Sequence, residues 1–198
     1  IMPSLVGSEM CIRDSYYVDK TGLIEELLKT EAEVTLITRP RRFGKTLGMS
    51  MLESFFDIRK NSRKLFEGLE IARQSELCSK WMNQCPTVSV SFRQVDGLNF
   101  TSAYDMLTMV FADLYNKHLY LLEDSHVTEF QKKTFTNIAH GCGSEKEVKS
   151  SLVLLTTMMQ QHYGKAVVLL IDEYDVPVAK ANAHGYYNEM LDVMKGLL

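Results

Sequence analysis

Arg39-Pro-Arg-Arg-Phe-Gly-Lys-Thr46 sets the architecture that we expect for this chain. It follows Val34-Thr-Leu-Ile-Thr38, a short apolar and β-branched run that predicts a buried strand. After it, apolar side chains recur at helical spacing: Leu47, Met51, Leu52, Phe55 and Phe56. A strand, a tight loop and a helix follow one another in this order in a phosphate-binding loop. There, backbone N–H groups and the helix N-terminus hold the anion.

The residue types within the loop agree with phosphate binding in part. In such a loop Lys45 reaches the β- and γ-phosphates and the Thr46 hydroxyl ligates Mg²⁺. The general pattern opens with glycine, whereas Arg39 stands at that position here. The alternative interpretation is a basic surface turn in which Arg41, Arg42 and the other cations are solvated. The flanking strand and helix favour the phosphate loop.

A second stretch supplies the other half of a nucleotide site. Ala166-Val-Val-Leu-Leu-Ile171 is a continuous apolar run, too short to span a membrane, and it predicts a central parallel strand. It ends in Asp172 and Glu173. Asp172 would hold the Mg²⁺ shell, and Glu173 would polarise an attacking water. The alternative is a strand that simply ends in two surface carboxylates.

Three motifs together resemble the predicted AAA-ATPase-like family of prokaryotes. They are Tyr16-Tyr-Val-Asp-Lys-Thr21, Leu36-Ile-Thr-Arg-Pro-Arg-Arg-Phe-Gly-Lys-Thr-Leu47 and Leu170-Ile-Asp-Glu-Tyr-Asp175. The family also carries arginine in place of the first loop glycine, and the resemblance covers residues 16–198. It implies an α/β fold, the three-layer αβα P-loop NTPase, with a mostly parallel sheet and a large helical insertion. Members often continue into a PD-(D/E)XK nuclease-like domain.

The resemblance and the motifs together define an expected site for ATP and Mg²⁺. The nucleotide would contact Arg39, Pro40, Arg41, Arg42, Phe43, Gly44, Lys45, Thr46 and Leu47. Lys45 and Glu173 would be catalytic, and Thr46 and Asp172 would ligate the metal. The expected function is ATP hydrolysis coupled to conformational change. Two alternatives stay open: a nucleotide-gated regulatory module with little hydrolysis, and a non-catalytic α/β interaction scaffold.

Composition narrows the possible partners. The chain has 198 residues, of which 45% are hydrophobic, and a net charge of −3, so nothing global points to nucleic acid or a membrane. Nucleic acid would be contacted only through the nuclease-like domain, and an oligomer is compatible with the sequence. Four cysteines lack metal-ligand spacing: Cys11, Cys78, Cys85 and Cys142. We therefore expect reduced thiols in a cytoplasmic protein.

The rest of the sequence predicts where the domain begins and which further elements it contains. Residues 1–15 resemble a sequencing-adaptor artefact or a disordered tail and are set apart from the ATPase-like domain of residues 16–198. Asp19-Lys20-Thr21 either caps a following helix or approaches the nucleotide. Alternating Val88, Val90 and Phe92 predict a second strand. The region of residues 100–162 is expected to be helical, and the apolar pattern of the last helix predicts a C-terminally truncated domain.

Overall fold

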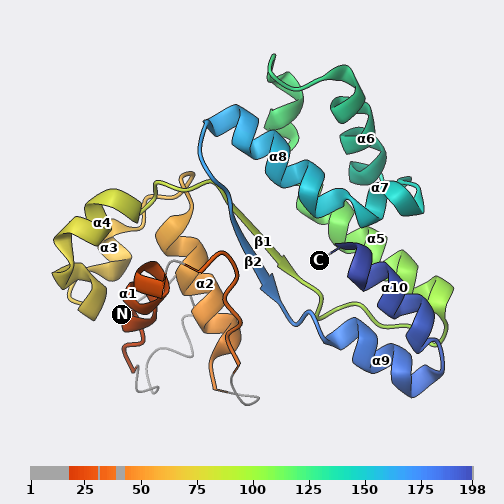
Figure 1. The fold of residues 1–198 in the computed structure, drawn as a ribbon, viewed down its shortest axis with the longest axis horizontal. Coiled ribbons are helices and arrows are strands. Elements are labelled where there is room, and N and C mark those ends of the chain that lie inside the picture. The colour runs from red at the N-terminus through yellow and green to blue at the C-terminus, as the bar shows by residue number, and fades with distance from the viewer. Residues whose placement is uncertain (1–17, 31, 39–42, 198) are drawn as a thin grey trace. The chain divides into compact units, whose positions relative to one another are not determined.

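The computed structural model describes residues 18–30, 32–38 and 43–197 (Figure 1). Most of these residues are helical, and the two strands assigned among them pair in one small parallel sheet. The chain divides into two units, one through Thr87 and one from Val88 onward, which are considered in turn. The described chain is a helix-rich α/β structure, in agreement with the α/β class expected from the sequence.

The first unit is built from short helices, two of which pack together through aromatic rings. Its helices are α1 (Gly22–Thr30), α2 (Lys45–Phe56), α3 (Arg63–Phe66), the 3-10 helix η3 (Glu70–Arg73) and α4 (Ser75–Trp81). Helix α2 buries Met51, Leu52, Phe55 and Phe56, as its apolar spacing predicts. The Phe55 ring meets the Phe66 ring of α3 edge to face, with ring centres 5.4 Å apart. This packing anchors the C-terminal half of α2.

Residues 34–38 do not form the buried strand that their β-branched composition predicts. The structure assigns them no strand, and the side chains of Val34 and Leu36 are 88% and 64% exposed. A strand needs a neighbouring strand to take up its backbone hydrogen bonds and an apolar layer to cover it. Among the residues that the structure describes, neither is provided at 34–38. This strand prediction is therefore wrong, because β-propensity without a pairing partner does not make a strand.

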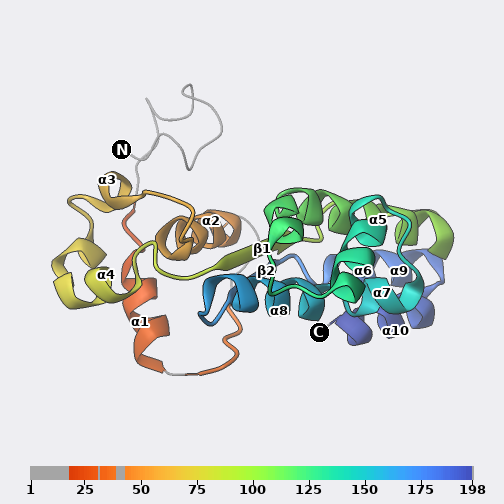
Figure 2. The ribbon, with the colours of Figure 1, turned by 90° about the horizontal axis from the view of Figure 1, so that it is seen from above.

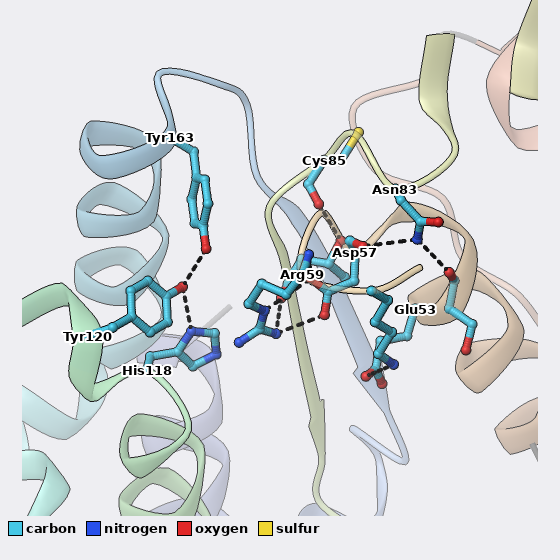
Figure 3. Close-up of polar contacts among 11 residues, drawn as sticks. Glu53, Asp57, Arg59, Asn83, Cys85, His118, Tyr120 and Tyr163 are labelled. Carbon is cyan, nitrogen blue, oxygen red and sulfur yellow. Dashed lines mark hydrogen bonds and ion pairs between the residues drawn. The ribbon is translucent and has the colours of Figure 1, made fainter. Parts of the chain in front are cut away.

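A hydrogen-bonded network around Asn83 closes the C-terminal end of α2 (Figure 3). Asn83 Nδ2 donates to the carbonyl oxygens of Ser54 and Asp57 at 3.1 and 3.0 Å. Asn83 Oδ1 accepts the amide of Ser62 at 2.9 Å. The Asp57 carboxylate, whose side chain is 2% exposed, pairs with Arg59 at 2.9 Å. These contacts hold Asn83 in a left-handed backbone conformation with φ of 56°.

The sheet consists of β1 (Thr87–Ser91) and β2 (Val168–Asp172), which lie side by side and run parallel (Figure 1). The sequence predicted strands at residues 88–92 and 167–171, and both strands are confirmed within one residue at each end. Parallel strands end at the same edge of a sheet, the edge at which α/β proteins bind ligands. Strand β2 therefore brings Asp172 to that edge.

The chain between β1 and β2 is helical, as the sequence predicts for residues 100–162. They are α5 (Phe100–Asn116), the 3-10 helix η4 (Leu119–Glu123), α6 (Glu129–Ala139), α7 (Glu145–Lys149) and α8 (Ser151–Tyr163). Capping boxes start three of them: Asn99 with Ser102, Thr128 with Gln131, and Ser144 with Glu147. Beyond β2 come α9 (Val176–His184) and α10 (Tyr187–Leu197), and α10 packs against α5, α7, α8 and α9 (Figure 2).

The second unit has one apolar core, to which β1 and the surrounding helices contribute. Tyr115 is completely buried there, and its hydroxyl donates to the carbonyl oxygen of Ser151 at 2.7 Å. Burial raises the pKa of Tyr115 far above its usual value. Nearby, Tyr120 takes part in a chain of polar rings with His118 and Tyr163 (Figure 3). Within the described ranges, no helix combines the length and apolarity that a membrane crossing requires.

Candidate functional site

Helix α2 begins directly after a glycine with a left-handed backbone. Gly44 precedes the helix in a left-handed conformation, with φ of 78° and ψ of 27°, and Lys45 is the first helical residue. Gly48 N–H closes the first turn by donating to the Gly44 carbonyl at 2.9 Å. Among the described residues, no side chain caps this helix end. The first N–H groups of a helix have no partner within the helix, so an uncapped N-terminus favours a bound anion.

The structure describes only part of the predicted loop. Arg39, Pro40, Arg41 and Arg42 lie outside the described residues. The Phe43 side chain is 61% exposed. Thr46 is exposed, whereas Lys45 and Leu47 are partly buried. The described residues of the loop thus stand together at the start of α2, with a charged and a hydroxyl side chain in its first turn.

Lys20 lies against the residues that precede α2. Its Nζ donates to the carbonyl oxygen of Phe43 at 3.3 Å. The same nitrogen is 3.4 Å from the point that a Cβ on Gly44 would occupy. Both contacts lie inside the first unit. Lys20 is therefore a second ammonium beside the Gly-Lys-Thr sequence.

Hydrogen bonds on either side of Lys20 fix the backbone that carries it. Asp19 accepts the Thr21 amide and the Thr21 hydroxyl, both at 2.8 Å, and the Glu70 amide at 2.7 Å. Thr21 Oγ1 in turn accepts the Ile71 amide at 3.1 Å. Burial alone would raise the pKa of Asp19, but hydrogen bonds from the Thr21 and Glu70 amides outweigh it and lower that pKa. An ionised Asp19 thus ties the start of α1 to η3.

The acidic half of the expected site lies at the end of β2. The Phe92 amide donates to the Asp172 carbonyl oxygen at 3.1 Å, which extends the pairing of β1 and β2 to the last residue of β2. Glu173 follows with a left-handed backbone, φ 53°. Its carbonyl oxygen accepts the Val176 amide at 3.1 Å. Both carboxylates are partly exposed at the carboxyl edge of the sheet, where a ligand could reach them.

Asp175 occupies the N-cap position of α9. Its carbonyl oxygen accepts the Ala179 amide at 2.9 Å, but its side chain makes no capping hydrogen bond within the described residues. A groove of about 820 Å³ begins beside it, lined mainly by apolar side chains of α9 and α10. Tyr174, Val178, Leu191 and Met194 are among them, and Lys195 is the cation in this lining.

The predicted site residues are thus placed as two halves. The loop with Lys20, Gly44 and Lys45 belongs to the first unit, and Asp172 with Glu173 belongs to the second. Within the described ranges, no group of three or more histidine, cysteine, aspartate or glutamate side chains has the arrangement of a metal site. The metal ligands expected from the sequence are of another kind, one hydroxyl and one carboxylate, and they stay a prediction. Lys20 was not among the site residues expected from the sequence, although the Asp-Lys-Thr sequence before a predicted helix pointed to this stretch.

The described residues form a helix-rich α/β chain with a Gly-Lys-Thr sequence at the start of helix α2. This chain belongs to the predicted AAA-ATPase family, whose model matches residues 8–198. The match begins inside the segment of residues 1–15 that the sequence analysis set apart, and residues 1–17 lie outside the described structure.

A curated relative extends well beyond this chain. An uncharacterised protein in the vnfD 5′ region of Azotobacter chroococcum mcd 1 is 27% identical over 165 residues, which cover 83% of this chain. The same alignment covers 26% of that relative, so this chain spans about a quarter of its length. No solved structure matches the chain.

Proposed function

We propose that this chain is the nucleotide-binding part of an ATPase with the three-layer P-loop fold, and that it binds and hydrolyses ATP with Mg²⁺. The observation that carries the proposal is the start of α2. There, a left-handed Gly44 leads into Lys45 and Thr46 at a helix end that no described side chain caps. Membership of the predicted AAA-ATPase family supports the same assignment.

The loop residues have distinct proposed roles in binding. Gly44 supplies the left-handed turn that lets the backbone approach a phosphate, a conformation that costs other L-residues about 1–2 kcal/mol. Lys45 contributes an ammonium to the β- and γ-phosphates, and the N–H groups of the first turn donate to the phosphate oxygens. Phe43 and Leu47 complete the loop, together with the expected contacts of Arg39, Pro40, Arg41 and Arg42.

The acidic residues have the proposed chemical roles. Glu173 accepts a proton from the attacking water as the water oxygen bonds to the γ-phosphorus and the bond to the β-phosphate oxygen breaks. Thr46 and Asp172 would serve as ligands of Mg²⁺, which would neutralise charge on the phosphates. The left-handed backbone of Glu173 supports an active role, because strained conformations concentrate where a side chain must be aimed.

Nucleotide binding and phosphate release test the two halves separately. We expect the chain to bind a fluorescent ATP analogue with Mg²⁺, and Lys45→Ala to abolish that binding, because a preorganised charge contributes several kcal/mol. Glu173→Gln should retain binding and lose steady-state phosphate release. The exposed Lys64 of α3 offers a control, since Lys64→Ala removes a cation outside the loop.

Each alternative predicts a different result. Unchanged affinity in Lys45→Ala would remove the loop from the proposal, and unchanged turnover in Glu173→Gln would remove that residue. Tight binding without phosphate release would favour a nucleotide-gated regulatory module. No binding at millimolar ATP with Mg²⁺ would favour a non-catalytic scaffold. Contact with nucleic acid would require the nuclease-like domain of longer family members, and assembly into oligomers is a further proposal.

A further inference from the structure

The Lys20 ammonium touches the described end of the phosphate loop from outside it. Its Nζ lies 3.3 Å from the Phe43 carbonyl oxygen and 3.4 Å from the Cβ position of Gly44. Gly44 is the residue at which the backbone turns into α2. A Cβ at this position would be in ordinary van der Waals contact with the Lys20 ammonium, so it is the left-handed backbone that favours glycine there.

The charge of Lys20 is left available by its surroundings. Among the described residues, no carboxylate forms an ion pair with it. The neighbouring Asp19 is engaged by the amides of Thr21 and Glu70 and by the Thr21 hydroxyl. The contact that Lys20 does make is a long hydrogen bond to a neutral carbonyl, which uses one of its three protons. Two protons and a full positive charge remain for another acceptor.

The backbone at Lys20 is held before any ligand arrives. The Leu23 amide donates to the Lys20 carbonyl oxygen at 3.1 Å, and the Ile24 amide donates to the Thr21 carbonyl oxygen at 3.0 Å. Asp19 binds the Glu70 amide, and Thr21 binds the Ile71 amide. Ile24 itself is completely buried. The backbone entropy of placing this residue is therefore lost on folding, which leaves mainly the rotamer entropy of the Lys20 side chain to be lost on binding.

We propose that Lys20 is a phosphate-binding residue of the nucleotide site, a second ammonium that contacts the triphosphate beside Lys45. This inference rests on the proposed function, since it assigns a further ligand to the same loop. A hydrogen bond from an ammonium to a phosphate is charge-assisted and stronger than the bond to the Phe43 carbonyl. When ATP binds, the Lys20 ammonium therefore donates to a phosphate oxygen, either in place of the Phe43 carbonyl oxygen or in addition to it.

Three substitutions separate the charge of Lys20 from its tether to the loop. Lys20→Arg retains charge and donors, Lys20→Gln retains a neutral donor for the Phe43 carbonyl, and Lys20→Met retains neither. We expect Lys20→Arg to bind the ATP analogue within a few-fold of the unmodified chain. Lys20→Gln and Lys20→Met should each bind at least about tenfold more weakly, the loss of one charged hydrogen bond. The loss should shrink at high salt.

A control variant and a second measurement test whether the effect on ATP binding is specific to Lys20. Lys64→Met should bind as the unmodified chain does. In the unmodified chain, ATP with Mg²⁺ should slow acetylation of Lys20 by an amine reagent, read by mass spectrometry, and leave the acetylation of Lys64 unchanged. Because this measurement uses the unmodified chain, it does not depend on whether a variant folds.

The outcomes distinguish the two proposals. If Lys45→Ala loses binding while Lys20→Met binds normally, the role of Lys20 is wrong and the proposed function stands. If Lys20→Gln binds normally and Lys20→Met does not, Lys20 is only a tether, and the inference is overturned. Absence of ATP binding by the unmodified chain would overturn both.

Discussion

Glu173 adopts a left-handed backbone directly after Asp172 ends strand β2, with φ of 53°. The other described non-glycine residue with positive φ is Asn83, at 56°. The Asn83 side chain makes hydrogen bonds to Ser54, Asp57 and Ser62 that account for its conformation. The Glu173 carboxylate has no such bonds within the described residues. Its strain is therefore maintained by the strand before it and the turn after it, which aim its side chain.

Relief of this strain should stabilise the protein while it removes the proposed base. Asparagine tolerates the left-handed region better than glutamate, so Glu173→Asn should raise the free energy of unfolding by about 0.5–1 kcal/mol. It should also abolish ATP hydrolysis. Urea unfolding and phosphate release measure the two effects. Glu173→Gln is the matched control, because it loses the carboxylate without gaining left-handed tolerance. Equal stability of the Asn and Gln variants would show that the backbone at 173 is not strained.

Loss of the Asn83 side chain should weaken the first unit. Asn83→Ala removes three hydrogen bonds and leaves alanine in a left-handed conformation. We expect a destabilisation of about 2–4 kcal/mol, measured by urea unfolding. Asn188→Ala on α10 is the control, since Asn188 is exposed and the substitution should change stability little. A change below about 0.5 kcal/mol in Asn83→Ala would contradict the proposed importance of this network.

Periodicity predicted the elements whose apolar side chains the fold pairs or packs. The strands β1 and β2, helix α2 and the helical region between the strands all follow from apolar spacing in the chain itself. The run at 34–38 has equally strong β-propensity, but it has no pairing partner among the described residues and lies exposed. Sequence periodicity reports which side chains favour burial, and it does not report whether a covering layer is present.

The site shows the same division between local and long-range information. The left-handed Gly44 at the start of α2 follows from the Gly-Lys-Thr motif, because glycine in a tight loop before a helix favours positive φ. The contact of Lys20 with the Phe43 carbonyl joins residues 23 positions apart, so no spacing rule contains it. The placement depends on Asp19 and Thr21 bonding to η3, a tertiary contact that only the folded chain reveals.

Asp124 should make the stability of the second unit depend on pH in the acid range. Its side chain is 6% exposed and contacts the imidazoles of His126 and His162. Hydrogen bonds from the His126 amide and from His162 lower the pKa of Asp124 to about 2. An unfolded aspartate titrates near pH 4. The folded state is thus favoured by ionised Asp124 above about pH 4, and this contribution is lost as the pH falls toward 2.

Replacement of Asp124 by asparagine tests this dependence. Asp124→Asn should be less stable than the unmodified chain at pH 7, and its stability should fall less steeply between pH 4 and pH 2. Urea unfolding followed across this range gives both quantities. Asp113→Asn is the control, because it removes an exposed carboxylate of α5 and should leave the fall in stability between pH 4 and pH 2 unchanged. If the free energy of unfolding fell equally steeply between pH 4 and pH 2 in Asp124→Asn and in the unmodified chain, Asp124 would not control this pH dependence.

Gly196 should be required where α10 passes the Lys149 side chain of α7. A Cβ on Gly196 would lie 2.9 Å from Lys149 Cγ and Cδ, and ion pairs from Lys149 to Asp192 and Glu145, at 2.6 and 2.7 Å, hold that side chain in place. Alanine is favoured over glycine inside a helix by about 1 kcal/mol, yet Gly196→Ala should destabilise the protein because of this clash. In a Lys149→Ala background the same substitution should become stabilising. Thermal unfolding of the unmodified chain, the two single variants and the double variant measures the coupling. If Gly196→Ala had an effect of the same sign in both backgrounds, Lys149 would not set the requirement for glycine.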